Sequence, residues 1–161
     1  MQAMGVSEMS ETRFTVTGRP ATKGSWRPVD NQRTGRTILI PQLRRSKPWE
    51  HAVALAARAA HKGDPWEKSV PVSLSVMFYF KRPASHFRTK AGKPDFTRLK
   101  PSAPAHPSTQ ASGDLDKLVR AIGDALSGIV YHDDAQIVSI EADKLYHGEG
   151  EGVAVTVAGM K

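Results

Sequence analysis

The sequence predicts an α/β fold of the α+β type, in which a small mixed β-sheet carries two helices packed on one face. Three observations lead to this fold class. Residues 70–80 (VPVSLSVMFYF) alternate apolar and polar side chains, as a strand of a packed sheet does. Residues 47–61 and 116–128 repeat apolar side chains at helical spacing. Further alternating segments stand near both ends of the chain, so strands flank the helices in the sequence.

The other expected elements follow from local signals. Pro48 lies in the first turn of the first helix after a capping Ser46, and Gly128 ends the second helix. Four more segments alternate as strands do; they are 13–17, 37–40, 135–146 and 152–158. Residues 1–11 are expected to be a flexible terminus, and residues 12–161 a single domain.

Two stretches without a regular pattern are rich in basic side chains. Residues 18–27 form a turn marked by glycine and proline that carries Arg19, Lys23 and Arg27, and residues 30–36 form a second turn. Residues 81–112 are expected to be a long irregular loop with five prolines. Its basic residues are Lys81, Arg82, Arg88, Lys90, Lys93, Arg98 and Lys100. Both stretches are read either as solvated loops or as contacts to a phosphate backbone.

The net charge of the chain indicates which kinds of molecule it binds. The chain of 161 residues has a formal net charge of +7 and a sequence pI of about 9.9, which favours nucleic acid first and an anionic membrane second. Residues 1–113 hold 19 Lys and Arg against 7 Asp and Glu, whereas residues 114–161 hold 4 against 9. No apolar run has the length of a membrane span, and no cysteine is present for disulfides or thiolate zinc sites. We expect a cytoplasmic protein that needs neither a membrane nor a nucleotide cofactor.

Four acids stand at two bends of the chain. Asp114 and Asp116 precede the second helix, and Asp133 and Asp134 precede the strand at 135–146. Either pair alone is more often a helix cap or a turn. If the helix returns to a strand beside its own start, the two pairs meet, and carboxylates this close need a cation. Oxygen ligands suit Mg²⁺, with Mn²⁺ as the second choice.

The same stretch resembles the signature of the RusA family of Holliday junction resolvases. The motifs are DLDKL at 114–118, DALSG at 124–128 and DDAQI at 133–137, in the family's order and spacing. KRPASH at 81–86 is similar to a segment that follows the third strand in the family. The resemblance extends over residues 12–158. It implies a RusA-like fold and a bacterial or phage-encoded endodeoxyribonuclease that resolves four-way DNA junctions by paired nicks in recombination and repair.

The resemblance also implies roles for individual residues. Asp114, Asp116 and Asp134 are expected as metal ligands, with Asp133 as a fourth acid. The family has an essential lysine one helical turn after the second aspartate, and here that position holds Arg120; Lys117 is the nearby alternative. A symmetric homodimer on branched double-stranded DNA is expected, since a two-fold substrate suits a two-fold protein. The rival interpretation is a basic DNA-binding protein without catalysis, in which Asp116→Asn changes nothing.

Overall fold

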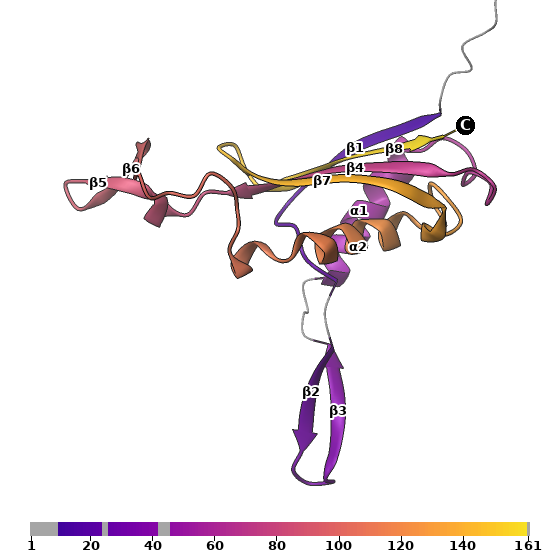
Figure 1. The fold of residues 1–161 in the computed structure, drawn as a ribbon, viewed down its shortest axis with the longest axis horizontal. Helices are drawn as coiled ribbons and strands as arrows, with labels where there is room; N and C mark the ends of the chain where they lie inside the picture. Colours follow the sequence, from indigo (N-terminus) through magenta and orange to yellow (C-terminus); the bar gives the residue numbers. More distant parts are fainter. Residues whose placement is uncertain (1–9, 24–25, 42–45, 161) are drawn as a thin grey trace, which may run out of the picture.

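A four-stranded sheet forms the centre of the protein. The computed structural model describes residues 10–23, 26–41 and 46–160. The strands are β1 (Glu11–Thr17), β4 (Val72–Lys81), β7 (Ile137–His147) and β8 (Gly152–Gly159), and their order across the sheet is β1-β8-β4-β7 (Figure 1). β8 runs antiparallel to both of its neighbours, whereas β4 and β7 are parallel. The predicted mixed sheet is therefore confirmed.

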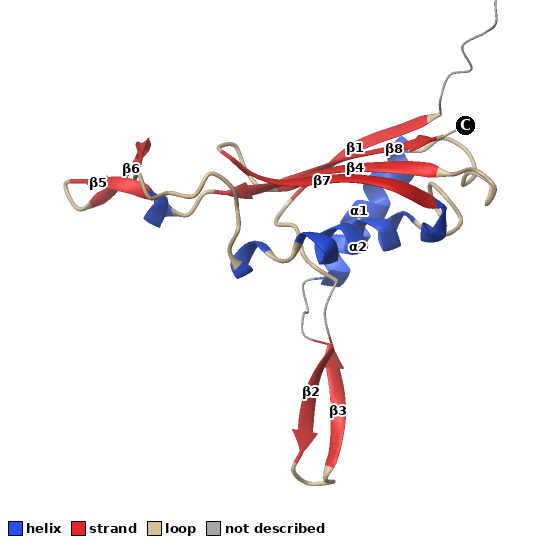
Figure 2. Cartoon of the chain, in the orientation of Figure 1, coloured by secondary structure: helices blue, strands red, loops and turns tan. Residues whose placement is uncertain are grey.

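Both long helices lie on the same face of this sheet, as predicted. Figure 2 shows α1 (Ser46–Ala60) and α2 (Leu115–Leu126) below the strands. The inward side chains of β4 are all buried against the helices; they are Val72, Leu74, Val76, Phe78 and Phe80. Burying an aliphatic or phenylalanine side chain of this kind stabilises a fold by roughly 1.5–3 kcal/mol, so this layer holds the sheet and helices together. No helix among the described residues has the length and apolar character needed to cross a membrane.

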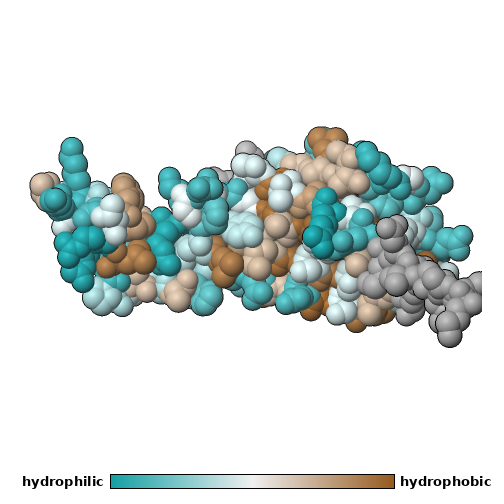
Figure 3. All heavy atoms as spheres, turned by 90° about the horizontal axis from the view of Figure 1, so that it is seen from above, coloured by the Kyte–Doolittle hydropathy of each residue, from teal (hydrophilic) through white to brown (hydrophobic). Residues whose placement is uncertain are grey.

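The opposite face of the sheet is not covered by any of the described helices. Many of its side chains in β4 and β8 are short or polar, for example Ser73, Ser75, Ala154 and Thr156, and these are partly or fully exposed. Figure 3 views the molecule from this side and shows a mixture of hydrophilic and apolar spheres over the strands. Alternation along the strands thus separates a packed face from an exposed one.

Two hairpins lie outside the central sheet, and of their four strands the sequence predicted only the one at 37–40. β2 (Trp26–Asn31) pairs with β3 (Arg36–Pro41), which confirms the strand expected at 37–40. The turn at 32–35 lies within the one expected at 30–36, and of the described part of the turn expected at 18–27 only residues 26 and 27 belong to a strand. β5 (Phe87–Lys90) pairs with β6 (Lys93–Leu99) inside the segment expected to be irregular. Ala91 and Gly92 both have positive φ, 51° and 74°, which is the backbone of a two-residue hairpin turn. β2, β5 and β6 lack a strict alternation of apolar and polar residues, which hides them from a pattern search.

The N-terminal strand starts earlier than predicted. Glu11 is already paired with Ala158 of β8, so the expected flexible terminus at 1–11 ends before it; residues 1–9 lie outside the described residues. At the other end of the β1–β8 pairing, position 152 requires a glycine because the backbone of Val16 comes very close to it. A Cβ atom there would lie 2.4 Å from the carbonyl oxygen of Val16, which is backbone and cannot rotate away.

β7 is an edge strand and differs from its predicted pattern. Val138 and Ile140 were expected on its apolar side, yet they are 62% and 55% exposed. The register against β4 shifts between Val72 and Ser73, so Val138 is an extra residue in the strand. Ala142 and Tyr146, further along, do pack against the core. An exposed apolar edge therefore runs beside α2.

Candidate active site at the two ends of helix α2

The first acid pair begins α2. Asp114 is the N-cap residue and has extended backbone angles (φ −74°, ψ 133°), as expected for the residue just before a helix, and the helix starts at Leu115. Its carboxylate does not cap the helix. Instead, Oδ2 of Asp114 forms an ion pair with Nζ of Lys117 at 2.9 Å. Asp116 lies in the first turn with its side chain exposed. Negative charge is stabilised at this helix end by the peptide dipoles.

The chain just before Asp114 is fixed from two sides. Gly113 has a φ of 79°, and a Cβ atom there would lie 2.6 Å from Cγ2 of Thr22. Nζ of Lys144, in β7, donates hydrogen bonds to the carbonyl oxygen of Gly113 (2.8 Å) and to Oγ of Ser112 (3.1 Å). Strand β7 and the loop at residues 18–23 therefore set where the first acid pair lies.

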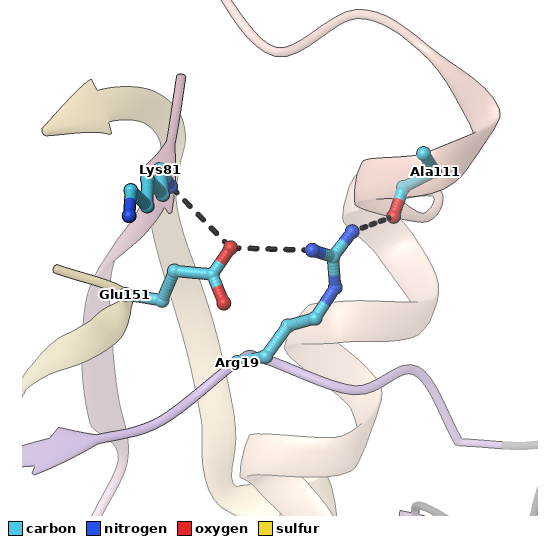
Figure 4. A network of polar contacts seen from close by, with 4 residues as sticks. All are labelled: Arg19, Lys81, Ala111 and Glu151. Carbon is cyan, nitrogen blue, oxygen red and sulfur yellow. Dashed lines mark hydrogen bonds and ion pairs between the residues drawn. The ribbon is translucent and has the colours of Figure 1, made fainter. Parts of the chain in front are cut away.

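The predicted basic residues of the loop at residues 18–23 form ion pairs inside the molecule. Nζ of Lys23 contacts Oδ2 of Asp124, on α2, and this hydrogen bond is the main reason that the pKa of Lys23 is raised. Arg19 donates to Oε1 of Glu151 (3.2 Å) and to the carbonyl oxygen of Ala111 (2.7 Å), as Figure 4 shows. The backbone N–H of Lys81 donates to the same Glu151 oxygen (3.4 Å). Both basic side chains remain about half exposed, so they keep a surface for a phosphate.

The second acid pair begins a 3₁₀ helix, Asp134–Gln136, just before β7. The backbone N–H of Ala135 donates to Oδ1 of Asp133 (2.8 Å), which makes Asp133 the cap of this short helix. That hydrogen bond is the main cause of a lowered pKa at Asp133, with the neighbouring Asp134 as the second. Asp133 is therefore ionised at neutral pH, and its side chain is exposed.

Gln136, which is buried, holds this bend in place. Its Oε1 accepts from the backbone N–H groups of His132 (2.9 Å) and Asp133 (3.1 Å), and its Nε2 donates to the carbonyl oxygens of Glu67 (2.9 Å) and Val70 (3.0 Å). One amide thus ties the acid pair to the segment that enters β4. A buried side chain with all its hydrogen bonds made positions its neighbours strongly.

The two acid pairs do not meet within one chain. Asp114 and Asp116 lie at the start of α2, and Asp133 and Asp134 lie beyond its end (Figure 1). The helix has 12 residues, which at about 1.5 Å each separates its ends by roughly 18 Å. Across the described residues, no group of three or more His, Asp or Glu side chains is placed to hold a metal ion. The convergence expected from the sequence is wrong for a single protomer, because α2 is long enough to keep its ends apart.

Tyr131 marks the far end of α2. Its hydroxyl donates to the carbonyl oxygen of Gly123 (2.8 Å), and its ring is fully buried. Burial, and then the charges of Asp134 and Asp124, raise the pKa of Tyr131 far above its ordinary value. The tyrosine is therefore a neutral structural anchor of the helix end and not a proton donor or acceptor at neutral pH.

The remaining predicted residues are spread over several elements. Arg120 is exposed on α2, and Asp124 pairs with Lys23 rather than with it. Arg82 donates to the carbonyl oxygen of Pro104 (2.7 Å), and Nε of Arg88 donates to that of Leu99 (3.3 Å). Lys90 and Lys93 are exposed at the turn of the β5–β6 hairpin. Arg27 belongs to β2, but its side chain lies outside the described residues.

Gln136 and Lys144, which hold the backbone beside the acids, were not selected from the sequence. Neither was Glu151, which pairs with Arg19. Gln136 is the last polar residue of the motif at 133–137, so its place in that motif was a signal. Lys144 and Glu151 gave none, because charged residues in strands and turns are common.

Comparison with known proteins identifies the family of this chain. A family model described as "Endodeoxyribonuclease RusA" matches residues 18–158. The chain is also 30% identical over 139 residues to the uncharacterized protein YqaN of Bacillus subtilis (strain 168), across 85% of this chain and 89% of that protein. The matched range contains β4, β7, all but the last residue of β8, both long helices and both acid pairs. The chain therefore belongs to the RusA endodeoxyribonuclease family.

Proposed function

We propose that this protein is a metal-dependent, structure-specific endodeoxyribonuclease that resolves four-way DNA junctions by paired nicks. Its role is in DNA recombination and repair in the cytoplasm of a bacterium, encoded by the chromosome or by a phage. Family membership supports DNA cleavage, and the net charge of +7 supports an electrostatic affinity for the phosphate backbone.

The observation that carries the proposal is the position of the two acid pairs at opposite ends of α2. In a homodimer whose two-fold axis crosses α2 near its middle, the two α2 helices run antiparallel. The start of one helix then lies beside the end of the other. Asp114 and Asp116 would face the partner's Asp133 and the partner's Asp134, and the dimer would have two identical acidic sites.

The surface beside α2 suits such a dimer. Val138 and Ile140 are exposed on the edge strand β7, which follows the second acid pair in the chain. Exposed aliphatic side chains on an unpaired strand edge mark an interaction surface or an aggregation hazard. A second copy that covers this edge would remove Val138 and Ile140 from water. The same arrangement would bring the first acid pair of each copy beside the second acid pair of the other.

The donor set of the proposed composite site fits a hard divalent cation. All four groups are carboxylates, which suit Mg²⁺ and, as the second choice, Mn²⁺. The lowered pKa of Asp133 keeps its carboxylate ionised at neutral pH without a metal, and Asp114 is paired with Lys117. Bringing the pairs together in a dimer raises their mutual repulsion, which a bound cation offsets.

A mixing experiment tests the composite site. Asp116→Asn and Asp134→Asn should each abolish cleavage of a synthetic four-way junction in the presence of Mg²⁺. Unfolding the two variants together and refolding them as a mixture gives about half heterodimers. Each heterodimer has one site with both substitutions and one site with neither, so nicking should return to about a quarter of the wild-type rate.

A site built within one chain predicts no recovery, because every site would then carry one substitution. The heterodimers should nick one strand only, and paired nicks should stay absent. Mixing Asp116→Asn with Asp114→Asn is the matched control, since both substitutions fall in the same pair and restore nothing. Unchanged cleavage by Asp116→Asn alone would support the rival DNA-binding protein without catalysis.

A further inference from the structure

The β5–β6 hairpin exposes apolar side chains within a strongly basic surface. Residues 81–100 carry seven Lys and Arg and one Asp. Phe96 is 65% exposed and Leu99 is 45% exposed. Figure 3 shows apolar spheres surrounded by hydrophilic ones at the end of the molecule where the hairpin lies. A solvated linker has no need of two such side chains.

The aromatic side chains in and beside the hairpin pack against one another. The rings of Phe87 and Phe96 are 5.1 Å apart at 70°, an edge-to-face pair that holds Phe96 on the hairpin surface. At the base of the hairpin, the guanidinium of Arg82 lies 4.3 Å above the ring of Tyr146. His86 packs edge-on against the same ring, 5.5 Å away. The Phe87–Phe96 pair and the Tyr146 ring with its two neighbours are therefore two packed aromatic groups.

A pocket lies between these two groups. It has a volume of about 360 Å³ and is lined by Phe87, Phe96 and Leu99 from the hairpin and by Arg82, Tyr146 and His147 from the end of the sheet. This volume lies in the range of pockets that bind small planar molecules. Most of its lining side chains are aromatic or aliphatic, and Arg82 adds a positive charge.

We propose that this pocket receives an unpaired nucleobase of the DNA, with Phe96 as the side chain on which the base stacks. A nucleobase has an apolar face and a phosphate close by, which the exposed ring and the surrounding Lys and Arg side chains match. A paired and stacked base presents no free face to Phe96. The pocket therefore favours single strands and branch points over uninterrupted duplex.

This inference rests on the proposed function and adds which part of the DNA the hairpin contacts. β4 and β7 are parallel, so their C-terminal residues Lys81 and His147 lie side by side at one end of the sheet. The segment that leads to the β5–β6 hairpin begins at this end. Lys144, three residues before His147, holds Gly113 beside Asp114. The stacking residue and the first acid pair thus belong to the same end of the molecule.

Binding without cleavage tests the proposal. In EDTA, we would measure the affinity of wild type, Phe96→Ala, Phe96→Leu and Phe96→Trp for a short oligothymidylate and for a duplex of equal length. Phe96→Ala should weaken binding to the single strand by roughly 5- to 100-fold and binding to the duplex by less than about twofold. Phe96→Leu keeps an apolar side chain on the hairpin and should still lose most of this affinity, whereas Phe96→Trp should retain it.

A junction with 2-aminopurine at the branch gives a second measurement, because the fluorescence of that base changes when it stacks. Wild type and Phe96→Trp should change the signal, and Phe96→Ala should not. Leu55→Ala, at an exposed leucine on α1, is the matched control and should behave as wild type. Equal binding of the single strand by Phe96→Ala and wild type would overturn the proposal, as would an equal loss for single strand and duplex.

These results separate the two proposals. If the wild type fails to cut four-way junctions in Mg²⁺ but Phe96→Ala loses affinity for single strands, the base pocket stands and junction resolution fails. If the wild type cuts junctions and Phe96→Ala binds single strands normally, the base pocket fails alone. A change in oligomeric state caused by Phe96→Ala, with DNA affinity unchanged, would overturn the base pocket and assign the exposed ring to a protein contact instead.

Discussion

Nζ of Lys144 donates a hydrogen bond of 2.8 Å to the carbonyl oxygen of Gly113, the residue immediately before Asp114. This contact joins the middle of an edge strand to the start of α2, 31 residues earlier in the chain. The ammonium group is partly buried and also contacts Ser112. Lys144 is therefore a positioning residue for the first acid pair and not a DNA contact.

Replacing Lys144 with methionine should destabilise the protein and reduce activity together. The substitution keeps the apolar stem and leaves the carbonyl of Gly113 without its donor, at a cost of about 1–3 kcal/mol. Urea unfolding measures the stability, and single-turnover cleavage of a four-way junction measures the activity. Lys144→Arg should restore more activity than Lys144→Met, which a purely structural apolar role does not predict. Lys62→Met, on an exposed lysine after α1, is the control and should be close to wild type in both.

Gln136 should contribute more to stability than any exposed polar residue does. Gln136→Leu removes the acceptor of two backbone N–H groups and the donor to the carbonyls of Glu67 and Val70. With several buried groups left unpaired, the free energy of unfolding should fall by about 2–4 kcal/mol. Gln32→Leu, in the exposed β2–β3 turn, should change it by less than about 0.5 kcal/mol. Equal effects of the two substitutions on the urea midpoint would contradict the role given to Gln136.

Gly152 should not tolerate even one added methyl group. A Cβ atom at this position would lie 2.4 Å from the carbonyl oxygen of Val16, so Gly152→Ala forces the pairing of β1 with β8 apart. We expect a loss of about 1–3 kcal/mol, the range for overpacking at a rigid position. Gly148→Ala, where no atom of the described residues lies within 4 Å of the added carbon, is the matched control. Thermal unfolding of the two variants measures this loss, and Gly152→Ala should have the lower midpoint temperature. Similar midpoint temperatures for both variants would contradict the close approach of Gly152 to Val16.

The carboxyl group of Asp133 should titrate with a pKa below the ordinary value of 3.8. A pKa lowered in the folded state stabilises the fold at pH values above the pKa of the unfolded chain, about 3.9, and this contribution disappears as the pH falls through the folded value. Because the N–H of Ala135 is the main cause, Asp134→Asn should leave the pKa of Asp133 lowered. Carboxyl-carbon NMR shifts followed from neutral to acidic pH measure it. A value at or above 3.8 in the wild type would remove the capping explanation.

The sequence predicted the parts of this fold that depend on strict alternation. β4 and β8 alternate without interruption, and their apolar side chains lie on the packed face as predicted. β7 does not follow the rule, because an extra residue at Val138 shifts its register and none of the described strands covers its outer edge. β2, β5 and β6 were missed because their residues do not alternate strictly, and it is the pairing of their backbones that defines them as strands.

The candidate site shows a different limit. The motifs at 114–118 and 133–137 selected the acids by their resemblance to the family, but a motif gives neighbours in sequence and not distances in space. The length of α2 keeps Asp116 and Asp134 of one chain apart, and only in the proposed dimer would a second copy bring such a pair together. Gln136 and Lys144 hold the acids by hydrogen bonds to backbone groups. The motif at 133–137 includes Gln136, but no pattern in the sequence shows which backbone groups either side chain contacts.

Lys117 and Arg120 should differ in what they do on α2. Lys117 is already paired with Asp114 at 2.9 Å, whereas Arg120 is exposed one turn after Asp116. The charge of Arg120 also opposes the rise that Asp124 causes in the pKa of Lys23, so the two cations lie near each other. We therefore expect Arg120 to contact the scissile-strand phosphate, because a cation near another cation gains most from an anion. A hydrogen bond to a charged group contributes about 1.5–3 kcal/mol, so Arg120→Ala should slow single-turnover junction cleavage roughly 10- to 100-fold.

The charge-conserving variant distinguishes phosphate contact from proton transfer. Arg120→Lys should recover most of the rate at neutral pH, since both side chains are cations there. Above about pH 10 a lysine ammonium loses its proton and a guanidinium does not, so the Arg120→Lys variant should lose activity in that range while the wild type retains it. Lys117→Met should have a smaller effect than Arg120→Ala at neutral pH. The opposite ranking would move the phosphate contact to Lys117 and leave Arg120 as a surface charge.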